Sequence, residues 1–278
     1  MRIAKYLMGP MLALLLTGCG VARLDDSLGR AVMQNNDLAT VEAGLPSYLL
    51  MVDGLIVNWP ERSGLLMTGA DLYGAYAGVF VDDEARAARL NEKALAYALR
   101  GACAHDGDYC DLRDIEVPAF EALLDEAGQD DVPVLFSLGG AWAGYIQTHT
   151  EDWNAVAELS RVRLLMERVV ALDEDYRYGQ AHMYLGVLNS ILPASLGGRP
   201  EQARDHFERA VALSEGRNLL ARVLFAEHYA RLVFDRELHD EQLRQVLDAE
   251  PDVPDLTLQN TYAKEQAQQL LDGADDYF

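Results

Sequence analysis

The chain has few basic residues for its size, and this shortage narrows the range of its partners. Among 278 residues, 23 are Lys or Arg and 45 are Asp or Glu, which gives a formal net charge of −22. Lysine is the rarest of these types, present only as Lys5, Lys93 and Lys264. So acidic a chain repels phosphate backbones and anionic membrane surfaces. We therefore expect no nucleic-acid partner.

The sequence also lacks the motifs of common enzyme classes. It contains no G-x-S-x-G, no H-E-x-x-H, no phosphate-binding Walker loop and no dinucleotide-binding fingerprint. Six histidines are scattered along the chain. His105 with Asp106 and Asp108 is a candidate for weak cation binding, but a solvated loop explains the same residues. Two cysteines and one histidine do not make a metal-ligand set. We expect neither an enzyme nor a bound cofactor or metal.

Only one segment reads as an export signal, and it lies at the N terminus. Arg2 and Lys5 open the chain, and a mostly apolar run, Tyr6–Leu16, follows them. This run is too short to cross a bilayer, and the order of charged start, apolar stretch and small residues is that of a secretory signal peptide. Its last residues, Leu16–Cys19, resemble the lipobox of bacterial lipoproteins, in which cleavage before the cysteine precedes attachment of a diacylglycerol to the thiol.

The lipobox divides the chain into three parts. We expect residues 1–18 to be a signal peptide, Cys19 to carry the lipid, and residues 19–36 to form a polar tether with little order. An ordinary signal peptide followed by an incidental cysteine is the alternative. Gly20, rather than Asp, follows the lipidated cysteine. This indicates a periplasmic protein anchored at the outer membrane, with the lipid as its contact with the bilayer.

The two remaining cysteines, Cys103 and Cys110, are seven residues apart. On one continuous helix they would lie about 10.5 Å apart, too far for a disulfide. The Asp106–Asp108 run between them is typical of a loop, which would bring them together. A disulfide would persist in an exported protein. Two buried free thiols are the alternative.

The periodicity of apolar residues predicts an all-α protein, because segments with a repeat of 3.6 residues follow one another and no alternating strand pattern stands out. Asp37 is positioned to cap a short helix, and Pro46 to begin a second helix that ends near Pro60. The later helices are expected at 63–81, 82–100, 117–127, 132–149, 153–172, 175–191, 200–214, 217–234, 238–249 and 257–272.

Small and large residues recur at spacings typical of tetratricopeptide repeats. The best match has Leu185-Gly186 on a first helix and Ala203, Phe207 and Ala210 on the second. Weaker copies begin at Leu138-Gly139, at Gly74 and at Phe225-Ala226. We therefore predict that residues 37–278 form a single domain, a right-handed superhelical stack of helix pairs with degenerate tetratricopeptide-like repeats. A generic helical bundle is the alternative.

The segment 192–229 resembles a particular family, the T component of TRAP transporters (TatT). The residues that carry the resemblance include Pro193, Gly197, Gly198, Pro200, Glu201, His206 and Phe207. The resemblance extends over nearly the whole mature chain. It implies a periplasmic lipoprotein that works beside the solute-receptor P component of a tripartite, ion-driven uptake system, and it allows a homo-oligomer and a small ligand. An envelope scaffold that organises other periplasmic proteins through its repeats is the alternative function.

Two features suggest a binding face on the repeats. Asp53 interrupts an apolar run, and a buried carboxylate needs a partner or a ligand. Aromatic residues also gather on the first helices of the pairs, which line the concave face of a helical solenoid. These are Tyr73, Tyr76, Trp142, Tyr145, Tyr184 and Tyr229. The alternatives are pairing of Asp53 with an arginine, or its exposure at the helix edge, and rings that belong to the core between repeats. His206 is expected to be a structural histidine at the surface.

Overall fold

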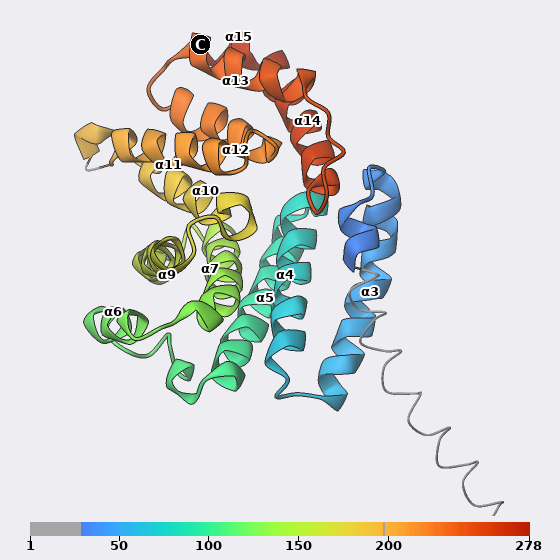
Figure 1. Ribbon diagram of the computed structural model, residues 1–278, viewed down its shortest axis with the longest axis vertical. Coiled ribbons are helices and arrows are strands. Elements are labelled where there is room, and N and C mark those ends of the chain that lie inside the picture. Colours follow the sequence, from blue (N-terminus) through green and yellow to red (C-terminus); the bar gives the residue numbers. More distant parts are fainter. Residues whose placement is uncertain (1–28, 197) are drawn as a thin grey trace, which may run out of the picture.

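The computed structural model describes residues 29–278, with the exception of residue 197 (Figure 1). The described residues form helices joined by loops and contain no strand, which confirms the predicted all-α class. The signal peptide, the lipidation site Cys19 and Gly197 of the family-like motif lie outside the described residues.

The first described helices differ from the prediction. Residues 29–33 are helical, although a tether of little order was expected there. Helix α3 (Leu38–Asn58) is continuous, so the prediction that Pro46 starts a separate helix is wrong. Pro46 removes one backbone hydrogen bond, but apolar residues on both sides of it, such as Val41 and Leu49, are buried on one face. This packing holds the helix together through the proline.

Successive helices then pack side by side: α4 (Ser63–Phe80), α5 (Glu84–His105), α7 (Val132–Gln147), α9 (Leu159–Leu172), α10 (Tyr176–Ser190) and α11 (Pro200–Leu213). Short elements connect or flank them: η1 (Gly107–Tyr109), α6 (Val117–Asp125), η2 (Gln129–Asp131), α8 (Trp153–Ala157) and η3 (Ala194–Leu196). The main core runs from α3 to α10 and is lined mostly by Leu, Ala, Val and aromatic side chains.

Glycines on first helices let large side chains of second helices approach closely. A Cβ added at Gly186 would come within 2.7 Å of the ring of Phe207, and one at Gly139 within 2.6 Å of the end of Met166. The helix pair α4–α5 uses Gly69, where a Cβ would lie 2.9 Å from the ring of Tyr97. Gly74, which marked this pair in the sequence, has open space around it. The three helix pairs thus share one kind of contact, in which a glycine of one helix faces a large side chain of the next. The superhelical repeat arrangement as a whole stays a prediction.

Three predicted helices are interrupted. The segment 153–172 breaks at Glu158 into α8 and α9, and 217–234 becomes α12 (Leu219–Leu224) followed by a π-helix, η4 (Phe225–Ala230). Helix α10 contains left-handed backbone at residues 177–179. Such backbone angles are unfavourable for residues other than glycine. Here they are held by contacts with distant segments, including the Arg177–Asp71 ion pair at 3.0 Å.

The C-terminal helices return towards the start of the chain. They are α13 (Arg236–Asp248), α14 (Thr257–Asp272) and α15 (Ala274–Tyr277), with a smaller core of their own. In Figure 1 the red α14 reaches the end of the blue α3, and Thr257 Oγ1 donates to Gln34 Oε1 at 3.3 Å. In an open repeat stack each unit contacts only its neighbours. This contact between distant parts of the chain therefore departs from the predicted simple stack.

Candidate functional site

Asp53 lies in a ring of donors between α3, α4 and α5. Lys93 Nζ contacts Asp53 Oδ2 at 2.5 Å, and Tyr73 donates to the same oxygen at 2.8 Å. Tyr97 donates to Oδ1 at 2.8 Å. We call these four residues the Asp53 centre. The carboxylate is thus paired within the protein, with a lysine where an arginine was considered.

The residues of the Asp53 centre stabilise one another's protonation states. Partial burial favours a higher pKa for Asp53, but the hydrogen bonds from Lys93, Tyr97 and Tyr73 outweigh it and leave this pKa below its usual value. Burial and the bond to Asp53 raise the pKa of Tyr97 to about 12. At neutral pH the centre therefore holds one anion, one cation and two neutral hydroxyl donors, which is an arrangement suited to joining three helices.

The aromatic residues of the predicted binding face are mostly core. Trp142 is fully buried, and Tyr73, Tyr76 and Tyr229 are only 4–6% exposed, so the prediction that these rings present a docking surface is wrong. Tyr145 and Tyr184 are half-buried. The physical reason is that rings fill the space between neighbouring helices. Trp142, for example, meets the ring of Phe120 edge-on, with centroids 6.2 Å apart.

Sequence reasoning missed a second carboxylate, Glu158, at the break between α8 and α9. The indole Nε1 of Trp142 donates to its Oε2 at 2.7 Å. The Nη2 of Arg113 bonds both carboxylate oxygens, at 2.8 and 2.9 Å, and the guanidinium also lies 4.8 Å from the ring centroid of Tyr145. We call these four residues the Glu158 centre. Glu158 lies at a helix break and follows Trp142 by 16 residues. Neither feature makes a sequence pattern that would have identified this centre.

The Glu158 centre borders a groove of about 920 Å³ between α5 and the segment that follows it. We call it the disulfide groove, because both Cys103 and Cys110 line it. Its lining is Pro60, Glu61, Leu99, Arg100, Cys103, Ala104, Tyr109, Cys110, Asp111, Leu112, Arg113, Asp114 and Glu158. With two arginines and four carboxylates, the lining has a formal charge of 2 − 4 = −2. The groove thus combines apolar side chains with charges of both signs.

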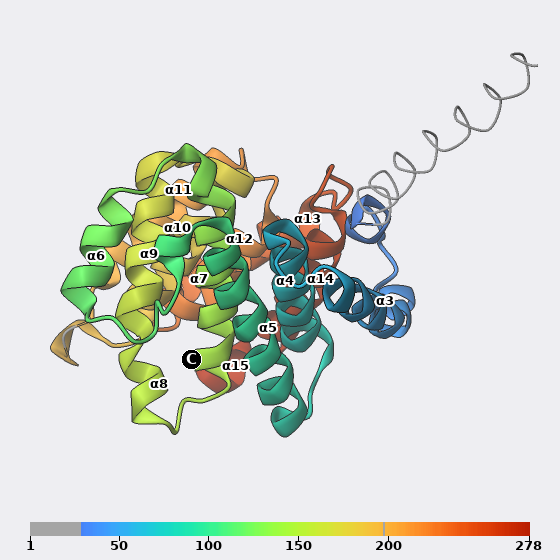
Figure 2. The same ribbon diagram turned by 90° about the horizontal axis from the view of Figure 1, so that it is seen from below.

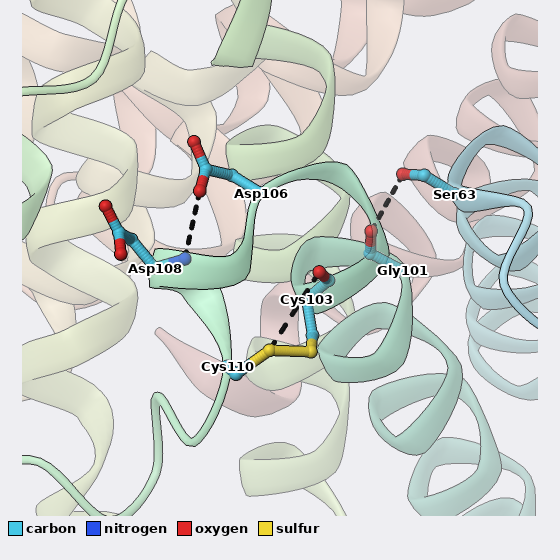
Figure 3. The surroundings of a disulfide bond; sticks show 6 residues. All are labelled: Ser63, Gly101, Cys103, Asp106, Asp108 and Cys110. Carbon is cyan, nitrogen blue, oxygen red and sulfur yellow. Dashed lines mark hydrogen bonds between the residues drawn. A yellow bond between two sulfur atoms is a disulfide. The ribbon is translucent and has the colours of Figure 1, made fainter.

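Local structure fixes the shape of this groove. Helix α5 ends at His105, and the turn through η1 brings Cys110 back to Cys103, with 4.4 Å between their Cα atoms and a disulfide between their sulfurs (Figure 3). Asp106 accepts from the backbone N–H of Asp108 at 2.9 Å and stabilises the turn. Beyond it, the buried Arg161 donates to the carbonyls of Leu112 and Ile115, at 3.2 and 2.6 Å. The wall of the groove is therefore anchored at both ends.

The family-like motif forms a tight loop before α11. A Cβ at Gly198 would lie 1.6 Å from the carbonyl oxygen of Leu192, so only glycine fits. The backbone N–H of Gly198 bonds the carbonyl of Pro193 at 3.1 Å. Pro200 and Glu201 occupy the first turn of α11, where a proline and an acidic residue are favoured. The loop borders a smaller groove of about 320 Å³, with Arg163 and Arg199 in its lining and no carboxylate.

His206 is half-buried and belongs to a histidine pair. Its Nδ1 lies 2.8 Å from Nδ1 of His182, whose Nε2 faces Glu174 at 3.3 Å. Burial, together with the neighbouring His182, lowers the pKa of His206 to about 4. The pair is therefore neutral at pH 7, with one ring donating to the other. In the part of the chain that the structure describes, no group of three or more His, Cys, Asp or Glu side chains is arranged to hold a metal ion.

Comparison with known proteins identifies relatives over almost the whole described fold. The family model described as "TRAP transporter T-component" matches residues 34–278. A protein of Treponema pallidum (strain Nichols), described as an uncharacterized protein, is 24% identical over 275 residues. That alignment covers 91% of this chain and 84% of the relative. The family match includes both carboxylate centres, the two grooves and the C-terminal helices.

Proposed function

The chain belongs to the TRAP transporter T-component family, and from this premise we propose that it is a lipid-anchored periplasmic accessory protein of a TRAP-type solute uptake system. The observation that carries the proposal is the family match over residues 34–278, which leaves no other large domain to supply a different function within that span. The lipobox-like residues before Cys19 support an anchor in the membrane, and Gly20 favours the outer membrane.

The partner in this proposal is the solute-receptor P component, and the docking surface is the disulfide groove rather than the predicted aromatic face. Four of those aromatic residues are too buried to meet a partner. The disulfide groove, at about 920 Å³, is larger than the groove of about 320 Å³ beside the loop before α11. Its rim offers the exposed Arg100 and Asp114 beside apolar side chains such as Leu99. Mixed polar and apolar lining is typical of surfaces that associate reversibly.

The test is the affinity of the lipidated protein in detergent for a solute receptor encoded beside it. We expect saturable binding, and charge reversal at the rim, by Arg100→Glu or Asp114→Arg, should weaken it at least tenfold, which is about 1.4 kcal/mol. Arg244→Glu is the matched control, because Arg244 is 65% exposed on α13, away from the groove. If both rim variants bind like the parent protein, the groove is not the docking surface.

The envelope scaffold remains the competing function. It predicts that no receptor encoded nearby associates, and that pull-down of the lipidated protein from envelope extract recovers other envelope proteins instead. Absence of receptor binding at high micromolar concentration would reject the transporter role and leave the scaffold. A solute that changes the affinity for the receptor would extend the proposal to a ligand of the complex.

A further inference from the structure

Helix α3 carries a strip of exposed apolar residues that no other described element covers. Leu50 is 71% exposed, Val57 80% and Met51 43%. With the exposed small residues Ala43, Ser47 and Gly54 they form one side of the helix, which we call the outer face of α3. Trp59, which follows the last residue of the helix, is not part of this face. The opposite side is buried, as Val41, Leu45, Leu49, Val52 and Ile56 show.

The outer face carries no charged side chain. Between residues 43 and 59 the only charged residue is Asp53, and it turns aside to pair with Lys93. In a chain in which 24% of the residues are charged, 17 consecutive residues with one charge, already neutralised by an ion pair, are unusual. A large exposed apolar area on a soluble domain marks an interaction surface.

Helix α3 is also an edge helix. It packs mainly against α4, and α14 touches it at one end. Figures 1 and 2, which view the molecule from directions 90° apart, both show α3 at the border of the fold. By length and composition it is the described helix that could cross a membrane. Its buried side and its ion-paired Asp53 belong to the folded domain, so it is suited to lie on a bilayer and not to span one.

We infer that the outer face of α3 rests on the membrane surface to which the protein is tethered. This inference depends on the lipid anchor of the proposed function. Only ten residues, 19–28, separate the proposed lipid from the described fold, and ten residues reach at most about 35 Å. The bilayer is therefore the surface that this helix meets at the highest local concentration.

The chemistry of the outer face fits the interface of a bilayer. An amphipathic helix lies in the headgroup region with its apolar side inserted. The net charge of −22 opposes approach to an anionic surface, and the uncharged outer face is where that repulsion is weakest. Three exposed large side chains on one helix cover roughly a few hundred Å², less than the ~800 Å² per partner of a stable protein interface, so a second copy of the chain fits this face less well.

The test uses the lipidated protein in vesicles of phosphatidylethanolamine and phosphatidylglycerol. Trp153 is 85% exposed and Trp59 49%, and both would obscure the signal, so Trp59→Phe/Trp153→Phe is the parent protein, in which Trp142 is buried. Met51→Trp in this parent places a reporter on the outer face. We expect the emission of the reporter to shift to the blue on vesicles and to be quenched by lipids brominated on their acyl chains. The parent protein without Met51→Trp should show neither signal.

Two charged variants test the role of the face. Leu50→Glu and Val57→Glu together should remove the quenching while the protein still sediments with the vesicles through its lipid. Val117→Glu is the matched control, because Val117 is an exposed valine on α6, and it should leave the quenching unchanged. Circular dichroism of all variants should report the same helix content.

The outcomes separate this inference from the anchor. If the protein does not sediment with vesicles, the anchor of the proposed function is wrong. If it sediments but the reporter at position 51 is not quenched by brominated lipid, the anchor stands and the membrane-facing position of α3 is overturned. A blue shift that depends on protein concentration, without quenching by lipid, would show that a second copy covers the face and would also overturn the inference.

Discussion

Asp53 and Glu158 are two partly buried carboxylates that the fold stabilises by similar means and uses in different places. Each accepts hydrogen bonds from a cation and from an aromatic side chain. Asp53 joins α3 to α4 and α5 and lines none of the grooves described above, whereas Glu158 lines the disulfide groove. The difference teaches that a charge visible in the sequence as an interruption of an apolar run can be purely structural. Glu158, the carboxylate beside the candidate site, lies at a helix break that no sequence pattern predicts.

The largest expected effect concerns Trp142, the buried donor of the Glu158 centre. Trp142→Ala should destabilise the fold by about 3–5 kcal/mol, because it removes a fully buried ring and leaves a cavity. Tyr73→Phe, which removes only a hydroxyl from the Asp53 centre, should cost about 0.5–1.5 kcal/mol. Denaturant unfolding compares the two. Equal losses would contradict the view that the Glu158 centre is more deeply built into the core.

The disulfide beside the Glu158 centre should come next. Its removal in Cys103→Ala/Cys110→Ala should cost about 2–3 kcal/mol, because a bridge over so short a loop constrains the unfolded chain only moderately. Receptor affinity should fall in this variant, since the turn forms one wall of the disulfide groove. Asp53→Asn is the control on the other centre and should leave receptor affinity unchanged. A fall in affinity for Asp53→Asn instead would reverse the assignment of the two centres.

Removal of either carboxylate should cost less than the loss of Trp142. Asp53→Ala and Glu158→Ala should each destabilise by about 1–3 kcal/mol, because each leaves a cation and neutral donors without their acceptor. Glu158→Ala should be the more costly, since the indole N–H of Trp142 is buried and finds no replacement from solvent. Double-mutant cycles with Arg113→Ala and Lys93→Ala measure the pairwise energies. A coupling near zero for Glu158 and Arg113 would show that the paired geometry contributes little.

The pH dependence of stability is expected to change only in acid, so at neutral pH it is the smallest of these effects. The lowered pKa of Asp53 means that its contribution is present above the ordinary carboxyl pKa and is lost as the pH falls below about 4. His206, with its pKa lowered to about 4, resists protonation in the fold, so its contribution is lost between about pH 6.5 and 4. Thermal melts at a series of pH values should show a smaller loss of stability between about pH 6.5 and 4 in His206→Gln than in the parent protein, and an unchanged loss in Asp53→Asn. If His206→Gln loses as much stability in this range as the parent protein, other groups cause the loss.

Periodicity was sufficient to predict the helical class and most helix positions, because each helix has one buried apolar side. The repeat pattern also singled out Gly186 and Phe207, and the structure brings this small residue and this large one into contact. It failed where distant segments decide the local structure. The left-handed residues 177–179 are held by Asp71 and by the carbonyl of Pro254, and no local pattern reports contacts that span so much of the chain. The prediction of an aromatic binding face failed for a related reason. Periodicity shows that a ring lies on the apolar side of its helix, but it does not show whether another helix covers that side.

The contact between Thr257 and Gln34 has a consequence for the order of folding. The two residues are 223 positions apart, so the N-terminal edge lacks this partner until almost the whole chain is available to fold. The entropic cost of closing a loop rises only slowly with its length, but a contact between such distant residues forms late. Before then α3 and its neighbours would form a nearly complete intermediate with one end unprotected. A chain that ends before α14 should then retain helices α4 to α11 while residues 29–36 become accessible to proteases.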